Sequence, residues 1–349
     1  MLHSMDEKKW FLRLALFSFL LAGLPAMAVI GFNYWIDPLW NFPHSHKYND
    51  VQFAFDERQQ KTNYINSRPF NYDSLLIGTS RVTYMDATQF KGEKVFNYAL
   101  SGLHIDEYLP YISYAAEKKG GDFDVIYMEL YYNSYNGIRN PNSPPDYYFN
   151  KSEGFLYKYK TLFSHSTYER AAANYGYSKD NVYEGARYYT RENVGKTAFV
   201  SERMDAKLER YINSVKSEKM VKSFVYSDSY KDKLQALKDA FPDTRFVIFT
   251  DPMPYKKQEA ILQIPEYREG YIRWYDEMVE VFGEVYSFQG RTPITESNES
   301  FFDVSHYTPE VGDEMIEALF APESSRDILT VVNEANLDGY LSAVQNVYP

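Results

Sequence analysis

Tyr72-Asp-Ser-Leu-Leu-Ile-Gly78-Thr-Ser80-Arg81 indicates the fold of this chain more clearly than any other segment. Its short apolar run ends in glycine, which is typical of a buried parallel strand leading into a tight turn. In open parallel sheets, active sites collect at the carboxyl ends of the strands. A serine that opens the next helix would have backbone N–H groups nearby to stabilise an oxyanion. Ser80 is therefore a candidate nucleophile, although Gly-x-Ser after a strand is more often only a turn and a helix cap.

Four further apolar runs continue this pattern along the chain, at residues 94–100, 124–130, 245–250 and 285–288. Segments whose apolar residues have helical spacing lie between or after them, at residues 105–116, 234–241, 265–282 and from Pro309 onward. Strands that alternate with helices imply βαβ units. The sequence therefore predicts an α/β fold with a parallel sheet and helices on both faces.

The N-terminal region contains an uncharged apolar run, Leu14–Phe32, with three cations just before it. This run is about as long as a helix that crosses a bilayer, and the cations belong on the cytoplasmic side. Everything from about Asn33 onward would then lie outside the cytoplasm. In an alternative interpretation, Leu14–Leu24 is the core of a signal peptide that is cleaved after Ala28. We favour a retained anchor, because the apolar character continues beyond that site to interfacial aromatic residues. The core helix of a soluble protein is a third interpretation.

These patterns divide the chain into five parts. We expect a cytoplasmic tip with a transmembrane anchor (1–35), a membrane-proximal linker and helix (36–70), an α/β core (71–132 and 229–322), a helical, Tyr-rich insertion over the catalytic edge (133–228), and a C-terminal helical extension (323–349). The expected membrane-proximal helix, 51–66, carries Asp56, Glu57, Arg58 and Lys61 on a polar face.

Composition excludes several classes of function. The net charge of −11, without a long Lys/Arg run, argues against nucleic acid as a partner. The absence of cysteine excludes a Cys nucleophile and thiolate metal sites. Glu129 and Asp251 fall at predicted strand ends, but they lack companions at metal-ligand spacing, so we interpret them as loop-capping acids and expect neither a metal nor a cofactor. The 34 tyrosines suit a carbohydrate or protein partner as well as core packing.

A second motif, Phe302-Asp303-Val-Ser-His306-Tyr, lies just before the last predicted core helix. A serine nucleophile needs a neutral imidazole to take its proton, and that imidazole needs a carboxylate to fix its tautomer. Of the six histidines, only His306 follows the last core strand with an acid beside it. An Asp-x-x-His also occurs by chance in surface loops, so the motif gains its meaning from Ser80.

Together with an Asn-x-x-x-x-Gly turn at 97–102, these motifs resemble the ordered blocks of the SGNH hydrolase superfamily, and most closely its membrane-anchored, DltD-like proteins. The resemblance covers about residues 72–320, without the insertion. It implies the flavodoxin-like sheet of the SGNH fold. It also implies that Ser80 is the nucleophile, that His306 is the general base oriented by Asp303, and that the N–H groups of Ser80 and Gly102 form the oxyanion hole.

Two features depart from the pattern of that superfamily. The usual Gly-x-Asn-Asp block is absent, and the matching strand runs on to Asn133. Either Asn133 supplies the third oxyanion donor from a shifted position, or the hole has only two donors, which would cost on the order of a hundredfold or more in rate. Arg81, next to the candidate nucleophile, either steers an anionic substrate or is a solvent-facing helix arginine.

The resemblance implies acyl transfer at the surface of a bacterial cell membrane by a single-pass protein whose catalytic domain is extracytoplasmic. Its expected partners are a membrane-bound O-acyltransferase (MBOAT-type), a cell-surface glycan or teichoic-acid-like acceptor, and the lipid bilayer through residues 14–32. Esterase and acyltransferase share the same triad, so the sequence does not separate them. The alternatives are a catalytically degenerate scaffold that binds glycan or the acyltransferase, and an assembly factor for an envelope complex.

Overall fold

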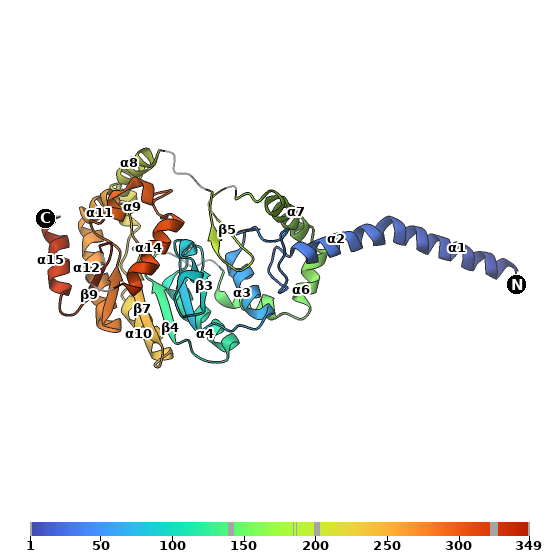
Figure 1. The fold of residues 1–349 in the computed structure, drawn as a ribbon, viewed down its shortest axis with the longest axis horizontal. Coiled ribbons are helices and arrows are strands. Elements are labelled where there is room, and N and C mark those ends of the chain that lie inside the picture. Colours follow the sequence, from blue (N-terminus) through green and yellow to red (C-terminus); the bar gives the residue numbers. More distant parts are fainter. Residues whose placement is uncertain are drawn as a thin grey trace.

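A six-stranded sheet forms the centre of the protein (Figure 1). The computed structural model describes residues 2–138, 143–183, 185, 187–198, 203–321 and 327–347. The strands of the sheet are β2 (Ser74–Gly78), β3 (Val95–Ala99), β4 (Val125–Glu129), β7 (Arg245–Thr250), β8 (Glu284–Ser287) and β9 (Thr330–Asn333). Their spatial order is β3-β2-β4-β7-β8-β9. In this sheet, the first five strands in chain order are parallel and follow the spatial order 2-1-3-4-5, which is that of flavodoxin-like sheets.

The last strand differs from the prediction. β9 pairs antiparallel with β8, so the sheet is mixed and not wholly parallel. It comes from the segment predicted as a purely helical extension, which also forms α15 (Leu337–Val347). An antiparallel edge strand is common on such sheets. The predicted boundary at residues 322 and 323 lies outside the described residues.

Helices cover both faces of the sheet. Neighbouring residues of a strand point to opposite sides, so each strand contributes to an apolar cluster on either face. Leu75 and Ile77 of β2 join one apolar cluster, and Leu76 between them joins another. The first cluster is closed by α4 (Ile105–Lys119), α10 (Tyr230–Ala240) and α12 (Pro265–Phe282), and the second by α14 (Pro309–Phe320). Because both faces are covered, β2 is buried at all five positions, as its uninterrupted apolar run predicts.

The segment between β4 and α10 is mostly helical, as expected, but it also contributes strands. Its helices are α5 (Pro145–Glu153), α6 (Tyr157–Lys160), η4 (Thr161–Phe163), α7 (His165–Asp180), α8 (Met204–Val215) and α9 (Glu218–Lys222). Strands β5 (Tyr188–Tyr189) and β6 (Gly195–Lys196) form a small antiparallel sheet with β1 (Gln52–Phe53). Runs of two residues are too short to show periodicity in the sequence.

The N-terminal helix projects from the body (Figure 1). It runs through α1 (Leu2–Ser18), the π-helical η1 (Phe19–Gly23) and α2 (Leu24–Ile36). The part from Glu7 to Ile36 is long and apolar enough to cross a membrane. It ends at Asp37, whose left-handed backbone (φ 47°) turns the chain into the body.

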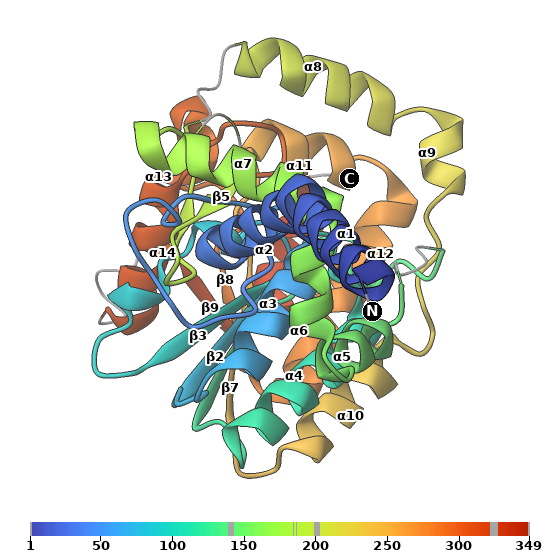
Figure 2. The ribbon, with the colours of Figure 1, turned by 90° about the vertical axis from the view of Figure 1, so that its right-hand side faces the viewer.

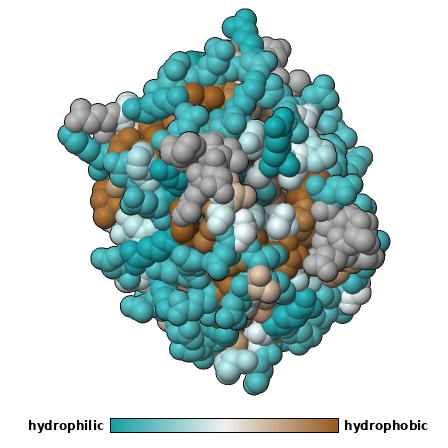
Figure 3. All heavy atoms as spheres, turned by 90° about the vertical axis from the view of Figure 1, so that its left-hand side faces the viewer, coloured by the Kyte–Doolittle hydropathy of each residue, from teal (hydrophilic) through white to brown (hydrophobic). Residues whose placement is uncertain are grey.

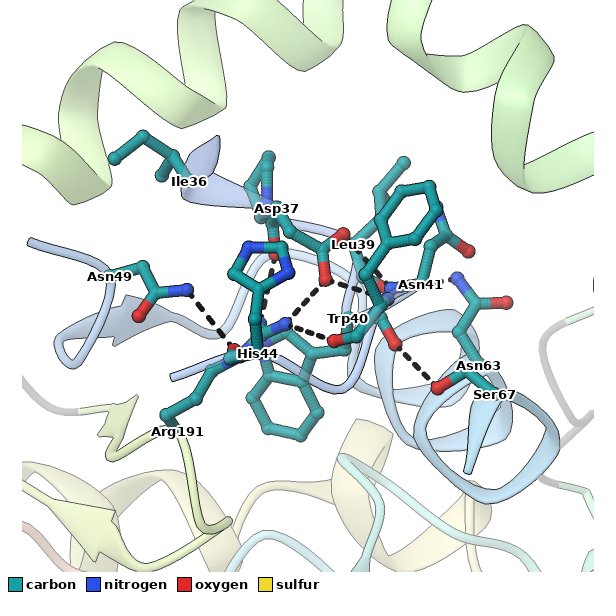
Figure 4. Close-up of polar contacts among 12 residues, drawn as sticks. Ile36, Asp37, Leu39, Trp40, Asn41, His44, Asn49, Asn63, Ser67 and Arg191 are labelled. Carbon is teal, nitrogen blue, oxygen red and sulfur yellow. Dashed lines mark hydrogen bonds and ion pairs between the residues drawn. The ribbon is translucent and has the colours of Figure 1, made fainter. Parts of the chain in front are cut away.

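The region expected as a membrane-proximal linker is folded into the body. Residues 37–50 form no regular element, yet Asp37 and Trp40 are buried, and the segment is fixed by polar contacts with Arg191 of the insertion (Figure 4). The helix expected at 51–66 is α3 (Glu57–Ser67), which begins after the capping side chain of Asp56. Nine of its residues are buried, and they include Glu57, Arg58 and Lys61 of the predicted polar face, which therefore lies inside the protein.

The remaining elements connect the strands and helices of the core. They are η2 (Val82–Tyr84), η3 (Ala87–Gln89), α11 (Tyr255–Leu262), α13 (Pro293–Glu296) and η5 (Asn298–Ser300). η2 begins two residues after Ser80, so the candidate nucleophile lies in a turn that leads into a single 3₁₀ turn and not at the start of an α-helix.

Candidate active site

The structure brings Ser80, His306 and Asp303 together at the carboxyl edge of the sheet. Ser80 Oγ lies 2.8 Å from His306 Nε2. On the other side of the ring, His306 Nδ1 lies 2.8 Å from Asp303 Oδ2. Since a carboxylate can only accept from Nδ1–H, Nε2 of the neutral ring is free to accept the hydroxyl proton of the serine. This arrangement matches the order nucleophile, base and orienting acid.

The loop that carries the imidazole is fixed by the same carboxylate. Asp303 Oδ1 accepts hydrogen bonds from the backbone N–H groups of Ser305 (2.7 Å) and His306 (2.8 Å). The ring of Phe302 stacks on the imidazole, with centroids 5.6 Å apart. Burial alone would raise the pKa of Asp303, but the hydrogen bond and charge of His306 outweigh it and hold this pKa below its ordinary value. Asp303 therefore stays ionised at neutral pH.

The turn that carries the serine is held by Glu129 at the end of the neighbouring strand β4. Both the backbone N–H and the hydroxyl of Thr79 donate to the Glu129 carboxylate. Gly78 is needed for this approach, because a Cβ there would lie 2.5 Å from Glu129 Oε2 and 2.4 Å from Val82. Glu129 thus has the loop-capping role that its place at the strand end predicts.

Glu129 gives the turn a pH-dependent stability. Burial, with the charge of Asp251, raises the Glu129 pKa from 4.5 to about 7. The pKa of Glu129 is higher in the folded protein than in the unfolded chain, so the protonated carboxyl stabilises the folded state. This contribution is complete below the pKa of the unfolded chain, and it is lost as the pH rises through about 7. We expect the free energy of unfolding of the native protein, relative to Glu129→Gln, to fall between about pH 5 and pH 8. Urea unfolding of both proteins at the two pH values measures this; a constant difference would contradict the prediction.

Arg81 is not a solvent-facing arginine, and this prediction was wrong. Its side chain is only 16% exposed, and Nε lies 3.0 Å from Asp251 Oδ2. The same nitrogen donates to the carbonyl of Ser305 at 2.8 Å, and Nη1 donates to Thr79 Oγ1 at 3.1 Å. The guanidinium therefore joins the residue before Ser80 to the residue before His306, and it fixes the two loops relative to one another.

The expected oxyanion donors lie at the ends of β2 and β3. Within the described part of the chain, the N–H groups of Ser80 and Gly102 donate to no protein acceptor. Gly102 has φ 59°, a conformation that favours glycine. Asn133 lies in the turn after β4 with φ 76°, and its side-chain oxygen is buried without a hydrogen-bond partner. The roles of the three residues in an oxyanion hole stay predictions.

Sequence reasoning missed the residues that hold the turn before Gly102. The backbone N–H of Ser101 donates to Glu57 Oε2 at 2.9 Å, and the Ser101 hydroxyl contacts the same carboxylate. Glu57 also accepts from Tyr189 at 2.6 Å and pairs with Arg187 at 3.2 Å. These contacts join α3 and the β5–β6 hairpin to the candidate site. The short, charged sequence of α3 contains no signal that would predict its burial.

No family model, curated protein or solved structure matches the chain at a significant level. The assignment to the SGNH superfamily therefore rests on the motifs and stays a prediction. Among the described residues, no group of three or more His, Asp or Glu side chains is arranged to hold a metal ion.

Proposed function

We propose that this protein is a membrane-anchored serine hydrolase or acyltransferase of the SGNH type, which adds or removes O-acyl groups on a cell-surface glycan. The main support is the hydrogen-bonded series from Ser80 through His306 to Asp303 at the carboxyl edge of the central strand. Ser80 lies 226 residues before His306 in the sequence.

The proposed chemistry uses two acyl transfers. His306 Nε2 takes the proton of Ser80 as Oγ attacks the acyl carbonyl, and the N–H groups of Ser80 and Gly102 bind the oxyanion. The intermediate collapses, and His306 returns the proton to the leaving oxygen. The acyl-serine then reacts with water or with a glycan hydroxyl, which His306 deprotonates in turn, and Ser80 recovers its proton. The first acceptor makes the protein an esterase and the second makes it a transferase.

The proposal includes the surroundings of the enzyme. The N-terminal helix anchors the chain in a bacterial cell membrane, with the body on the extracytoplasmic side. A membrane-bound O-acyltransferase of the MBOAT type delivers the acyl group, and a glycan or teichoic-acid-like polymer accepts it. Support for this part comes from the resemblance to DltD-like proteins and from the apolar helix.

Covalent labelling tests the proposed nucleophile. The full chain in detergent is treated with a fluorophosphonate, and the labelled peptide is identified by mass spectrometry. We expect one adduct, on Ser80, because among the serines that the structure describes only Ser80 lies within hydrogen-bond distance of an imidazole that a carboxylate orients. Ser80→Ala should lose the adduct, whereas Ser229→Ala, at an exposed serine, should keep it. Equal lack of reaction in native protein and Ser80→Ala would instead favour the degenerate binding scaffold.

A further inference from the structure

The base of the N-terminal helix is built into one side of the body. The side chain of Asn33, on the last turn of α2, donates to the carbonyl of Leu162 at 2.8 Å. One residue earlier, the ring of Phe32 packs on Tyr168 and Tyr175 of α7, and its centroid lies 5.8 and 5.9 Å from theirs. Viewed along the helix, α6 and α7 flank α2 (Figure 2). The segment from α6 to α7 is thus fixed at the level where the apolar helix ends.

This segment exposes an unusual amount of apolar surface. Outside the N-terminal helix, ten large apolar side chains of the described residues are exposed, and five of them lie between residues 155 and 168. We call these five the anchor-side patch: Phe155 (83% exposed), Leu156 (46%), Tyr159 (48%), Phe163 (71%) and Tyr168 (39%). Exposed apolar side chains that gather in one place mark an interaction surface. By contrast, the face at the opposite end of the body is mainly hydrophilic (Figure 3).

The chemistry of the patch fits a lipid surface. Lys158 and Lys160 are exposed among its aromatic residues, and the ammonium of Lys158 lies over the rings of Tyr159 and Phe42. Aromatic rings with basic side chains are the usual composition of protein at the level of the lipid headgroups. Cations there are also attracted by anionic lipid headgroups.

The length of the helix sets the depth of the patch. The apolar helix from Glu7 to Ile36 has 30 residues, whereas the hydrocarbon core needs only about 20. If the uncharged run up to Phe32 fills that core, Asn33 and its partner Leu162 lie at the membrane surface. We infer that the anchor-side patch inserts into the headgroup region, so that the body rests on the bilayer by this face. This inference rests on the proposed anchoring, but not on the proposed chemistry.

Single cysteines can test this contact, because the chain has none of its own. Phe163→Cys, Leu20→Cys within the anchor and Met220→Cys on α9 are each labelled with the fluorophore NBD. α9 lies at the end of the body opposite to α2 (Figure 1). The three full-length proteins are reconstituted into vesicles of phosphatidylcholine and phosphatidylglycerol that carry a doxyl quencher near the headgroup. All three side chains are exposed, so the labels leave the core intact.

We expect the quencher to dim the labels at Leu20 and Phe163 several-fold more than the label at Met220. If the label at Leu20 is quenched but the label at Phe163 is quenched no more than the label at Met220, the inference is overturned and the anchor stays intact. In that case, a partner protein would be the better occupant of the patch. Lack of quenching at all three positions would overturn the anchor and the inference together. Fluorophosphonate labelling of the same variants reports separately on the proposed chemistry.

Discussion

Asp303→Asn should slow the reaction of Ser80 with a fluorophosphonate by about four orders of magnitude. The native carboxylate accepts from His306 Nδ1–H, which leaves Nε2 as the acceptor for the serine proton. The amide of asparagine would donate to Nδ1 and force the ring proton onto Nε2, where it can no longer take a proton from Ser80. The amide oxygen can still accept from the N–H groups of Ser305 and His306, so the loop should keep its shape.

The pseudo-first-order rate of labelling measures this effect, and the unfolding midpoint checks the fold. Asp243→Asn, at an exposed aspartate, makes the same chemical change away from the site and should react at the native rate. His306→Ala should slow labelling at least as much as Asp303→Asn, because it removes the base itself. The effects of residues that act as one unit do not add, so the two losses should be of similar size. A rate for Asp303→Asn within tenfold of the native rate would mean that the carboxylate does not orient the base.

The sequence predicts the five parallel strands of the central sheet well, because they are largely buried and read as apolar runs bounded by turn residues. It also predicts which motifs can meet. Ser80 follows β2, and the loop with Asp303 and His306 follows β8 and precedes α14. Since parallel strands have their carboxyl ends at one edge, residues distant in sequence arrive there together. The 2.8 Å contact between Ser80 and His306 is the result of that topology.

Several features that sequence reasoning missed depend on contacts between distant charged residues. Glu57 and Arg58 suggest a solvated helix face, yet Arg58 pairs with Glu107 at 2.9 Å and Glu57 pairs with Arg187. Nothing local in a charged residue tells whether a partner will cover it. Arg81 was misjudged for the same reason, because its partner Asp251 lies 170 positions further along the chain (251 − 81 = 170). Burial of such residues is visible only once the partners are known.

Loss of the Arg191 guanidinium should destabilise the protein by about 3–5 kcal/mol, the usual cost of leaving one member of a buried ion pair alone. Arg191 and Asp37 are each 2% exposed and paired with one another (Figure 4). Arg191 also donates to the carbonyls of Asp37 (3.0 Å), Phe42 (2.7 Å) and His44 (3.1 Å). Burial raises the pKa of Asp37, and the charge of Arg191 opposes that shift. In Arg191→Met, the Asp37 carboxylate stays buried but loses the cation that offsets the cost of its burial.

A double-mutant cycle separates the pair from the packing around it. The N–H groups of Asn41 and Phe42 donate to different oxygens of Asp37, so Asp37→Asn removes the charge and keeps one of the two hydrogen bonds. Because the buried charge is gone, Arg191→Met combined with Asp37→Asn should be more stable than Arg191→Met alone. Chemical unfolding in detergent gives the free energy of unfolding of the native protein, the two single variants and the double variant. Asp37 directly follows α2, and Arg191 lies between β5 and β6, where Gly195 packs on Thr83 beside the serine turn. The pair therefore lies between the N-terminal helix and the candidate site. Equal stabilities of Arg191→Met and the double variant would show that the buried charge of Asp37 does not cause the loss.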